Sequence, residues 1–281
     1  MEFKSIRNTA IAALAITSLG FASCKKEVPA PVKTTEPTAQ EVMFEQTFDQ
    51  AFKIMQALSD GSYFKNDNLA AALGSDCATL TADSSVSPHT LTIDFGTTGC
   101  VNSEGRTLYG KIIISNYDVK LRQAGTSIGI TFQDTRNNNV IVNGTATITN
   151  SGPNASGNMV FDVALNATED LLVSGKIINS VGTMSYEFTS GITTVTKEDD
   201  LLSVTGSIGG DDQNGRHYSA STGTPLVKSL ASGCNVYYTA GTLTIDIPTE
   251  APKMYDYGTG ACDDIATVTQ SGVTTTVQLS E

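Results

Sequence analysis

Apolar and polar residues alternate along much of the chain. In the segment Phe161-Asp-Val-Ala-Leu165, the first, third and fifth side chains fall on one face of an extended strand and the others on the opposite face. A period of two is typical of strands that bury one face and expose the other, as in antiparallel sheets. This pattern, or a run of β-branched residues, predicts strands at 91–95, 111–115, 127–132, 140–149, 159–165, 184–188, 201–208, 236–247, 265–269 and 273–279.

Turn-forming residues separate these strands at intervals of about 8–15 residues. We therefore predict an all-β fold, an antiparallel β-sandwich or open barrel built as a long meander. The stretch 107–208 contains no obvious domain boundary, and residues 38–281 are predicted to form a single β-rich domain. The predicted turns are 137–139, 151–153, 211–215 and 271–272.

A helical pattern precedes the strands. Thr38 and Glu41 have the spacing of a capping box, in which each side chain bonds the backbone N–H of the other residue. Four apolar residues then recur at helical spacing, and Asp60-Gly61 offers a stop. We predict an amphipathic helix over residues 38–60 that packs on the sheet; a helix that plugs a curved sheet, or one that binds a partner, is the alternative. The apolar stripe consists of Phe44, Phe48, Phe52 and Met55.

The first residues have the pattern of a bacterial lipoprotein signal. Lys4 and Arg7 precede an uncharged, largely apolar stretch that is too short to span a bilayer. Small residues then lead to a cysteine, so residues 1–23 are predicted to be a signal peptide and Cys24 to carry a lipid such as palmitate. Residues 24–37 contain several prolines and form a predicted tether. We expect a lipid anchor in a bacterial outer membrane, on its periplasmic or its cell-surface face.

The composition fits an exported β protein. Of the 281 residues, 17 are basic and 29 are acidic, for a formal net charge of −12 at pH 7. An acidic surface repels nucleic-acid phosphates and gives no electrostatic grip on anionic lipid. We therefore expect no nucleic-acid partner, and we expect attachment to the membrane to depend on the acyl chains.

Four further cysteines flank a short internal repeat. Thr90-Leu-Thr-Ile-Asp94 returns as Thr242-Leu-Thr-Ile-Asp246, and a glycine-containing segment that ends in cysteine follows each copy. Exported cysteines form lasting disulfides, and four cysteines allow three pairings. Because a cysteine stands on both sides of each copy, we favour disulfides within the copies, Cys77–Cys100 and Cys234–Cys262. The chain has no C-x-x-C spacing and only two histidines, which argues against a metal site.

Both ends of the β-rich region also carry a family resemblance. The motifs resemble signatures of uncharacterised Bacteroidota lipoproteins, although that family tends to have a fuller basic cluster where this chain has Thr107-Leu-Tyr109. The resemblance implies the location and the β fold expected above, and it implies no activity and no catalytic residues. The segments concerned are Leu91 to Cys100, Glu104-Gly-Arg106, Gly110-Lys-Ile-Ile-Ile114 and Asp256-Tyr-Gly-Thr-Gly-Ala-Cys-Asp263.

Several carboxylates are candidate site residues. Asp94 and Asp246 occupy matched positions in the repeat. Carboxylates placed in this way could act as an acid–base pair or bind calcium. More commonly, an aspartate before a turn accepts hydrogen bonds from nearby backbone N–H groups. Asp256, Asp263 and Asp264 surround a Gly-Thr-Gly turn, and we consider calcium binding there as an alternative to a solvated turn. We favour the structural interpretation of all five.

The remaining candidates are basic or aromatic. A hydrolase would need His89 or His217 beside both a carboxylate and a hydroxyl, and Arg106 has the geometry to grip an anion or to cover a strand edge. Clustered tyrosines stack on sugars or, as often, pack in cores and cross-strand pairs. These tyrosines are Tyr237, Tyr238, Tyr255 and Tyr257.

From these features we expect a protein that is not an enzyme. It is predicted to be a non-catalytic cell-envelope lipoprotein, a structural, adhesive or ligand-binding module without cofactor or metal, whose partner is an envelope protein or a glycan. One alternative is a periplasmic carrier of a lipid or other apolar ligand, with an apolar cavity beside the helix. The other is a hydrolase.

Overall fold

The structure is a computed structural model that describes residues 51–54, 77–101, 107–137, 140–172, 175–194, 196 and 198–279. Contacts divide the chain into a unit of residues 1–30 and a unit of residues 31–281, and every described residue belongs to the second. The predicted signal peptide, Cys24, the tether and most of the predicted helix lie outside the described residues.

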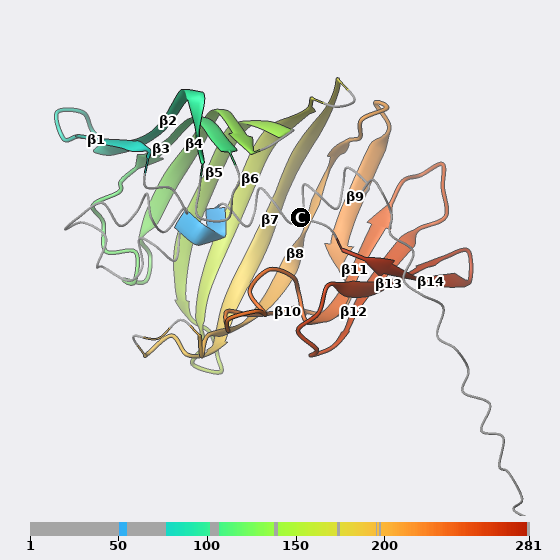
Figure 1. The fold of residues 1–281 in the computed structure, drawn as a ribbon. Coiled ribbons are helices and arrows are strands. Elements are labelled where there is room, and N and C mark those ends of the chain that lie inside the picture. The colour runs from blue at the N-terminus through green and yellow to red at the C-terminus, as the bar shows by residue number, and fades with distance from the viewer. Residues whose placement is uncertain are drawn as a thin grey trace, which may run out of the picture. The chain divides into compact units, whose positions relative to one another are not determined.

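Strands are the main secondary structure of the described chain (Figure 1). All strands belong to one antiparallel sheet, and each strand from β1 to β8 and from β10 to β14 pairs with the next, so the sheet is a long meander interrupted only between β9 and β10. The prediction of an all-β antiparallel fold with a long meander is confirmed. The strands are β1 (Thr79–Asp83), β2 (Thr90–Val101), β3 (Thr107–Ser115), β4 (Ser127–Asn137), β5 (Val140–Pro153), β6 (Met159–Leu171), β7 (Lys176–Ser190), β8 (Leu201–Asp211), β9 (His217–Thr222), β10 (Leu226–Ser229), β11 (Ala240–Asp246), β12 (Lys253–Thr259), β13 (Ile265–Gln270) and β14 (Val273–Gln278).

Two short strands share one place in the sheet. Both β9 and β10 lie between β8 and β11, where β9 pairs with one half of β8 and β10 with the other. The interruption between them is closed by Thr242 of β11, whose Oγ1 accepts the N–H of Thr224 at 2.8 Å and whose carbonyl accepts the N–H of Gly223 at 2.8 Å. The backbone groups that the break would leave unpaired are thus satisfied.

One face of the sheet forms the core. Val163 of β6 is fully buried between its register partners, Ile148 of β5 and Met184 of β7. Similar apolar rows continue as far as Ala266 and Val277, which face each other in the last two strands. The intervening residues of each strand form the opposite face, which is rich in threonine and serine. This division follows directly from the alternation in the sequence.

A helical turn at residues 51–54 packs on the buried face. Ala51, Phe52 and Ile54 are fully buried, and the Phe52 ring stacks on that of Tyr186 in β7. For this turn, the expected packing of helix on sheet is confirmed, whereas Phe44, Phe48 and Met55 lie outside the described residues. Within the described part of the chain, no helix has the length and apolar character needed to cross a membrane.

Two interior glycines allow neighbouring strands to approach closely. Gly144 in β5 has φ +146°, and a Cβ there would lie 2.3 Å from the carbonyl oxygen of Asn166. Gly206 in β8 has φ +154°, and its Cβ would lie 2.1 Å from the carbonyl oxygen of Thr183. Glycine within a strand permits a bend that any side chain would block.

The predicted disulfides are present. Cys77 and Cys100 are bonded with their Cα atoms 5.6 Å apart, and Cys234 and Cys262 with theirs 4.8 Å apart. The sequence separations of 23 and 28 residues correspond to a stabilisation of about 3–4 kcal/mol each in the chain-entropy account. The first bond joins the segment before β1 to the end of β2, as the repeat indicated.

One predicted turn is wrong. Residues 151–153 were expected to turn, but they end β5, and the ladder with β6 shifts register between Asn150 and Gly152. The chain turns later, where the Asn154 side chain accepts the backbone N–H groups of Ser156 and Asn158. An asparagine that bonds its own following backbone competes well with glycine and proline as a turn former.

Candidate binding surface

The matched carboxylates of the repeat have structural surroundings. Asp94 accepts the Gly96 N–H at 2.9 Å and pairs with Lys111 Nζ at 2.9 Å. The hydrogen bond from Lys111, followed by that from Gly96, lowers the pKa of the Asp94 carboxyl. Asp246, at the matched position, is exposed at the end of β11, in register with Ser219.

The three acidic residues near the C-terminus are each bonded locally. Asp256 accepts the Gly258 N–H at 2.9 Å, and Asp263 accepts the Ile265 N–H at 3.2 Å. Asp264 accepts the side-chain amide of Gln278 at 2.7 Å, which ties the turn to β14. Within the described residues, no group of three or more His, Cys, Asp or Glu side chains is arranged to hold a metal ion.

Each histidine lies next to a carboxylate on the surface. His89 Nδ1 is 2.6 Å from Asp118 Oδ2, and the hydrogen bond from His89 lowers the pKa of Asp118. His217 Nδ1 is 3.7 Å from Asp211 Oδ1, and the His217 side chain is 72% exposed. Both arrangements supply one of the two neighbours that a hydrolytic triad needs.

The tyrosine cluster is mostly part of the core. Tyr238, Tyr255 and Tyr257 are buried, and the rings of Tyr238 and Tyr257 meet edge to face with centroids 5.5 Å apart. The ammonium of Lys228, also buried, lies 5.5 Å from the Tyr238 ring centre. The alternative of a sugar platform is therefore wrong for these three rings, because a ring must show a face to solvent to stack on a sugar. Arg106 lies outside the described residues.

The loop between β8 and β9 is held by one carboxylate. Asp212 is buried and accepts the backbone N–H groups of Asn214 and Arg216, each at 2.8 Å. The Arg216 guanidinium also bonds it, with Nη2 2.7 Å from Oδ2, and continues to Glu250. Burial is the largest single influence on Asp212 and opposes its ionisation, but the hydrogen bonds from Arg216 and Asn214 and the charge of Arg216 together outweigh it, so the pKa of Asp212 lies below its ordinary value. The predicted hairpin loop is confirmed.

A buried polar cluster on β6, β7 and β9 was not predicted from the sequence. The hydroxyls of Ser180 in β7 and Tyr218 in β9 are hydrogen-bonded, and Glu169 of β6 is also fully buried. Burial raises the pKa of Tyr218 to about 12, and the charge of Glu169 adds to the effect. The cluster borders Ile178 and Ile247, which form a small separate core with Tyr218. Because it is closed to solvent, the cluster shapes the interior rather than a binding site.

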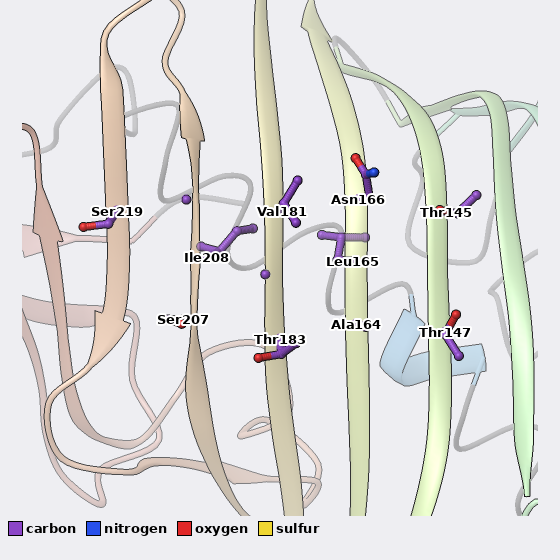
Figure 2. Close-up of a pocket in the computed structure, with 12 residues that line it drawn as sticks. Thr145, Thr147, Ala164, Leu165, Asn166, Val181, Thr183, Ser207, Ile208 and Ser219 are labelled. Carbon is purple, nitrogen blue, oxygen red and sulfur yellow. The ribbon is translucent and has the colours of Figure 1, made fainter.

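The exposed face carries an open pocket of about 530 Å³ over β5 to β9 (Figure 2). Two adjacent cross-strand rows form its floor. One runs Thr147, Ala164, Thr183 and Ser207, and the other runs Thr145, Asn166, Val181, Gly209 and Ser219. Leu165 and Ile208, the register partners of Gly182, also line it. We call this surface the β5–β9 pocket.

The chemistry of the β5–β9 pocket is uniform. None of the described residues that line it is ionisable, although the chain as a whole has a net charge of −12. Its hydroxyl and amide groups both donate and accept hydrogen bonds. Val181, which is 60% exposed, adds an apolar contact among them. Such a surface suits an uncharged ligand that has both hydroxyl groups and C–H faces.

Sequence reasoning did not find this pocket. Alternation assigns Ala164 and Asp162 to the solvent face of β6, but it does not show which residues of β5 and β7 stand beside them. The sequence does show small, uncharged residues at solvent-facing positions of successive strands. Whether those residues lie side by side can be decided only when the register of the strands is known.

The chain matches no protein-family model, no curated protein and no solved structure.

Proposed function

We propose that this chain is a non-catalytic envelope lipoprotein that binds a neutral glycan in the β5–β9 pocket. The observation that carries the proposal is the lining of the pocket, which is made of small hydroxyl, amide and aliphatic groups without an ionisable side chain. A neutral polysaccharide offers matching hydroxyl groups, and it meets no repulsion from an acidic protein. Anionic polymers lack a cationic partner in the pocket.

The cellular setting rests on the sequence. The signal pattern before Cys24 and the resemblance to uncharacterised Bacteroidota lipoproteins support export and a lipid anchor in the outer membrane. The two disulfides agree with an oxidising compartment, where such bonds persist. A lipid-anchored module with an exposed sheet face is well suited to holding a polymer near the membrane.

The alternatives have weaker support. A carrier of apolar ligands needs free space between helix and sheet, but the helical turn packs directly on the sheet through Phe52 and Tyr186. A hydrolase needs a hydroxyl as well as a carboxylate at a histidine. The side-chain contacts that the structure describes for His89 and His217 are to Asp118 and Asp211. We therefore place binding ahead of both.

Binding is tested by isothermal titration with dextran, mannan and pullulan as neutral probes and alginate as an anionic one. We expect at least one neutral glycan to bind the wild-type chain and Thr183→Arg to weaken that binding more than tenfold, because its side chain fills the pocket. Thr81→Arg, which places the same side chain on exposed β1, is the matched control and should bind normally. Binding by alginate alone, or undiminished binding by T183R, would overturn the proposal.

The lipid anchor has a separate test. Cells that express the chain are grown with an alkyne analogue of palmitate, and incorporation is read on a gel for the wild type and for Cys24→Ala. Label on the wild type and its loss in C24A are expected. An unlabelled wild-type chain in the soluble fraction would contradict the anchor while leaving the glycan test unaffected.

A further inference from the structure

β14 is an edge strand of the sheet that the described residues form. β14 pairs with β13 through an unbroken register from Gln270 and Val273 to Ile265 and Gln278. It is the terminal strand of the sheet order, and no other described strand pairs with its outer edge. Among the described residues, its backbone N–H and C=O groups on that side have no strand partner, and such an edge is a template for an added strand.

β14 lacks the features that usually protect an edge. Natural edge strands carry charged residues, proline or bulges that discourage pairing with another chain. The strand reads Val-Thr-Thr-Thr-Val-Gln, without a charge or a proline, and its ladder with β13 contains no bulge. Val273 is 65% exposed, so an apolar side chain is presented there. By contrast, β1, the edge strand at the other end of the sheet, ends with a charged residue, Asp83.

The strand is also complementary to itself. Residues 273–277 read Val-Thr-Thr-Thr-Val in either direction. Antiparallel pairing centred on Thr275 sets Val273 opposite Val277 and Thr274 opposite Thr276, so each residue meets its chemical equal. Cross-strand pairs of β-branched residues stabilise a sheet, and no like charges face each other in this register. A twofold axis generates this arrangement, which is the commonest symmetry of soluble oligomers.

We propose that two copies of this chain associate by antiparallel pairing of their β14 strands across a twofold axis at Thr275. The two sheets then continue into each other, and exposed Val273 is covered by Val277 of the second copy. A contact of one strand pair is smaller than about 1,200 Å², so the dimer is weak and reversible. Because each copy has a net charge of −12, the association strengthens as salt screens the repulsion.

The test uses sedimentation velocity over a concentration series at physiological ionic strength. The full chain carries Cys24→Ser, so that no acyl group at that position contributes to association. We expect this chain to dimerise as its concentration rises. Thr275→Lys and Thr275→Glu should each be monomeric, since like charges then meet at the axis. An equimolar mixture of T275K and T275E should dimerise again, because opposite charges meet there.

Thr81→Lys on the opposite edge strand is the matched control and should dimerise like the parent chain. Circular dichroism checks that every variant is folded. If T275K is unfolded, Val273→Lys replaces it, since that side chain is already exposed. A parent chain that stays monomeric at every concentration, dimers of T275K as strong as the parent's, or a mixture that stays monomeric would each overturn the proposal.

Discussion

The ring of Phe52 lies stacked on the ring of Tyr186, with centroids 4.9 Å apart and an angle of 20° between the planes. Both side chains are almost fully buried, at 1% and 2% exposure. This contact joins the helical turn at 51–54 to the centre of the sheet. Phe52 belongs to the apolar stripe with helical spacing, and Tyr186 belongs to a strand whose side chains alternate between two faces. The stacking is the main aromatic contact between the turn and β7.

Phe52→Ala should therefore reduce the free energy of unfolding by about 3–5 kcal/mol, because it removes a buried ring and leaves a cavity. Urea denaturation followed by circular dichroism measures the change. Val101→Ala, at a side chain that is 61% exposed, is the control and should change stability by less than about 0.5 kcal/mol. Equal effects of the two substitutions would show that the turn does not hold the sheet.

Tyr218 should make the protein sensitive to alkali. Its pKa is about 12 in the folded state, against about 10 for an ordinary tyrosine, so the folded state keeps its proton to higher pH than the unfolded state. The resulting stability is fully present below pH 10 and is lost as the pH rises through 12, a decrease of about 2–3 kcal/mol. Urea denaturation from pH 8 to pH 12 measures this decrease.

Tyr218→Phe supplies the control for the alkaline limb. The variant loses the hydrogen bond to Ser180 and is less stable at pH 8, but it has no hydroxyl to ionise at this position. Its stability should consequently fall less steeply between pH 10 and pH 12 than that of the wild type. Parallel pH profiles for the two proteins would contradict the assignment.

The contribution of the β8–β9 loop to stability should depend on pH in the acid range. Arg216→Ala should destabilise the fold by about 1–3 kcal/mol at pH 7, because it leaves the buried Asp212 carboxylate with fewer donors. The pKa of Asp212 is lowered in the folded state, so its contribution exists above pH 3.8 and is lost as the pH falls through the folded value. The difference in the free energy of unfolding between R216A and the wild type should therefore become smaller below about pH 4.

His217→Ala tests whether that effect is specific to the buried pair. His217 also lies next to an aspartate, but both side chains are largely exposed, so the substitution should cost less than about 0.5 kcal/mol. Thermal unfolding at pH 7 compares the two variants. A loss as large as that of R216A would mean that the loop depends on surface charge.

The sequence predicted the fold where single strands carry their own signal. Phe161, Val163 and Leu165 define the buried face of β6 without reference to any other strand, and the repeat around Thr90 and Thr242 predicted both disulfides. The missed strands have weaker patterns. β9 buries Tyr218 and the small Ala220, and the alternating tyrosines of β12 were compatible both with a sugar platform and with packing in a core.

The β5–β9 pocket could not be predicted from the sequence for a different reason. Its residues are ordinary in sequence, and they form a surface only because Thr183 stands beside Ala164 on one side and Ser207 on the other. That arrangement depends on register, which is a property of pairs of strands. The burial of the Glu169 carboxylate could not be predicted either, since the alternating strand pattern alone assigns polar residues to the solvent-facing side.

Gly206 gives the sharpest test of how the sheet bends. Gly206→Ala should cost about 1–3 kcal/mol, because φ of +154° is unfavourable for alanine and its Cβ would press on the carbonyl oxygen of Thr183 at 2.1 Å. Gly157→Ala shares the positive φ, at +83°, but has no heavy atom within 4 Å of the new Cβ, so it measures the backbone cost alone. Thermal unfolding of the two variants separates contact from conformation. A larger loss in G206A than in G157A means that close strand approach is required, and equal losses mean that the strands move apart freely.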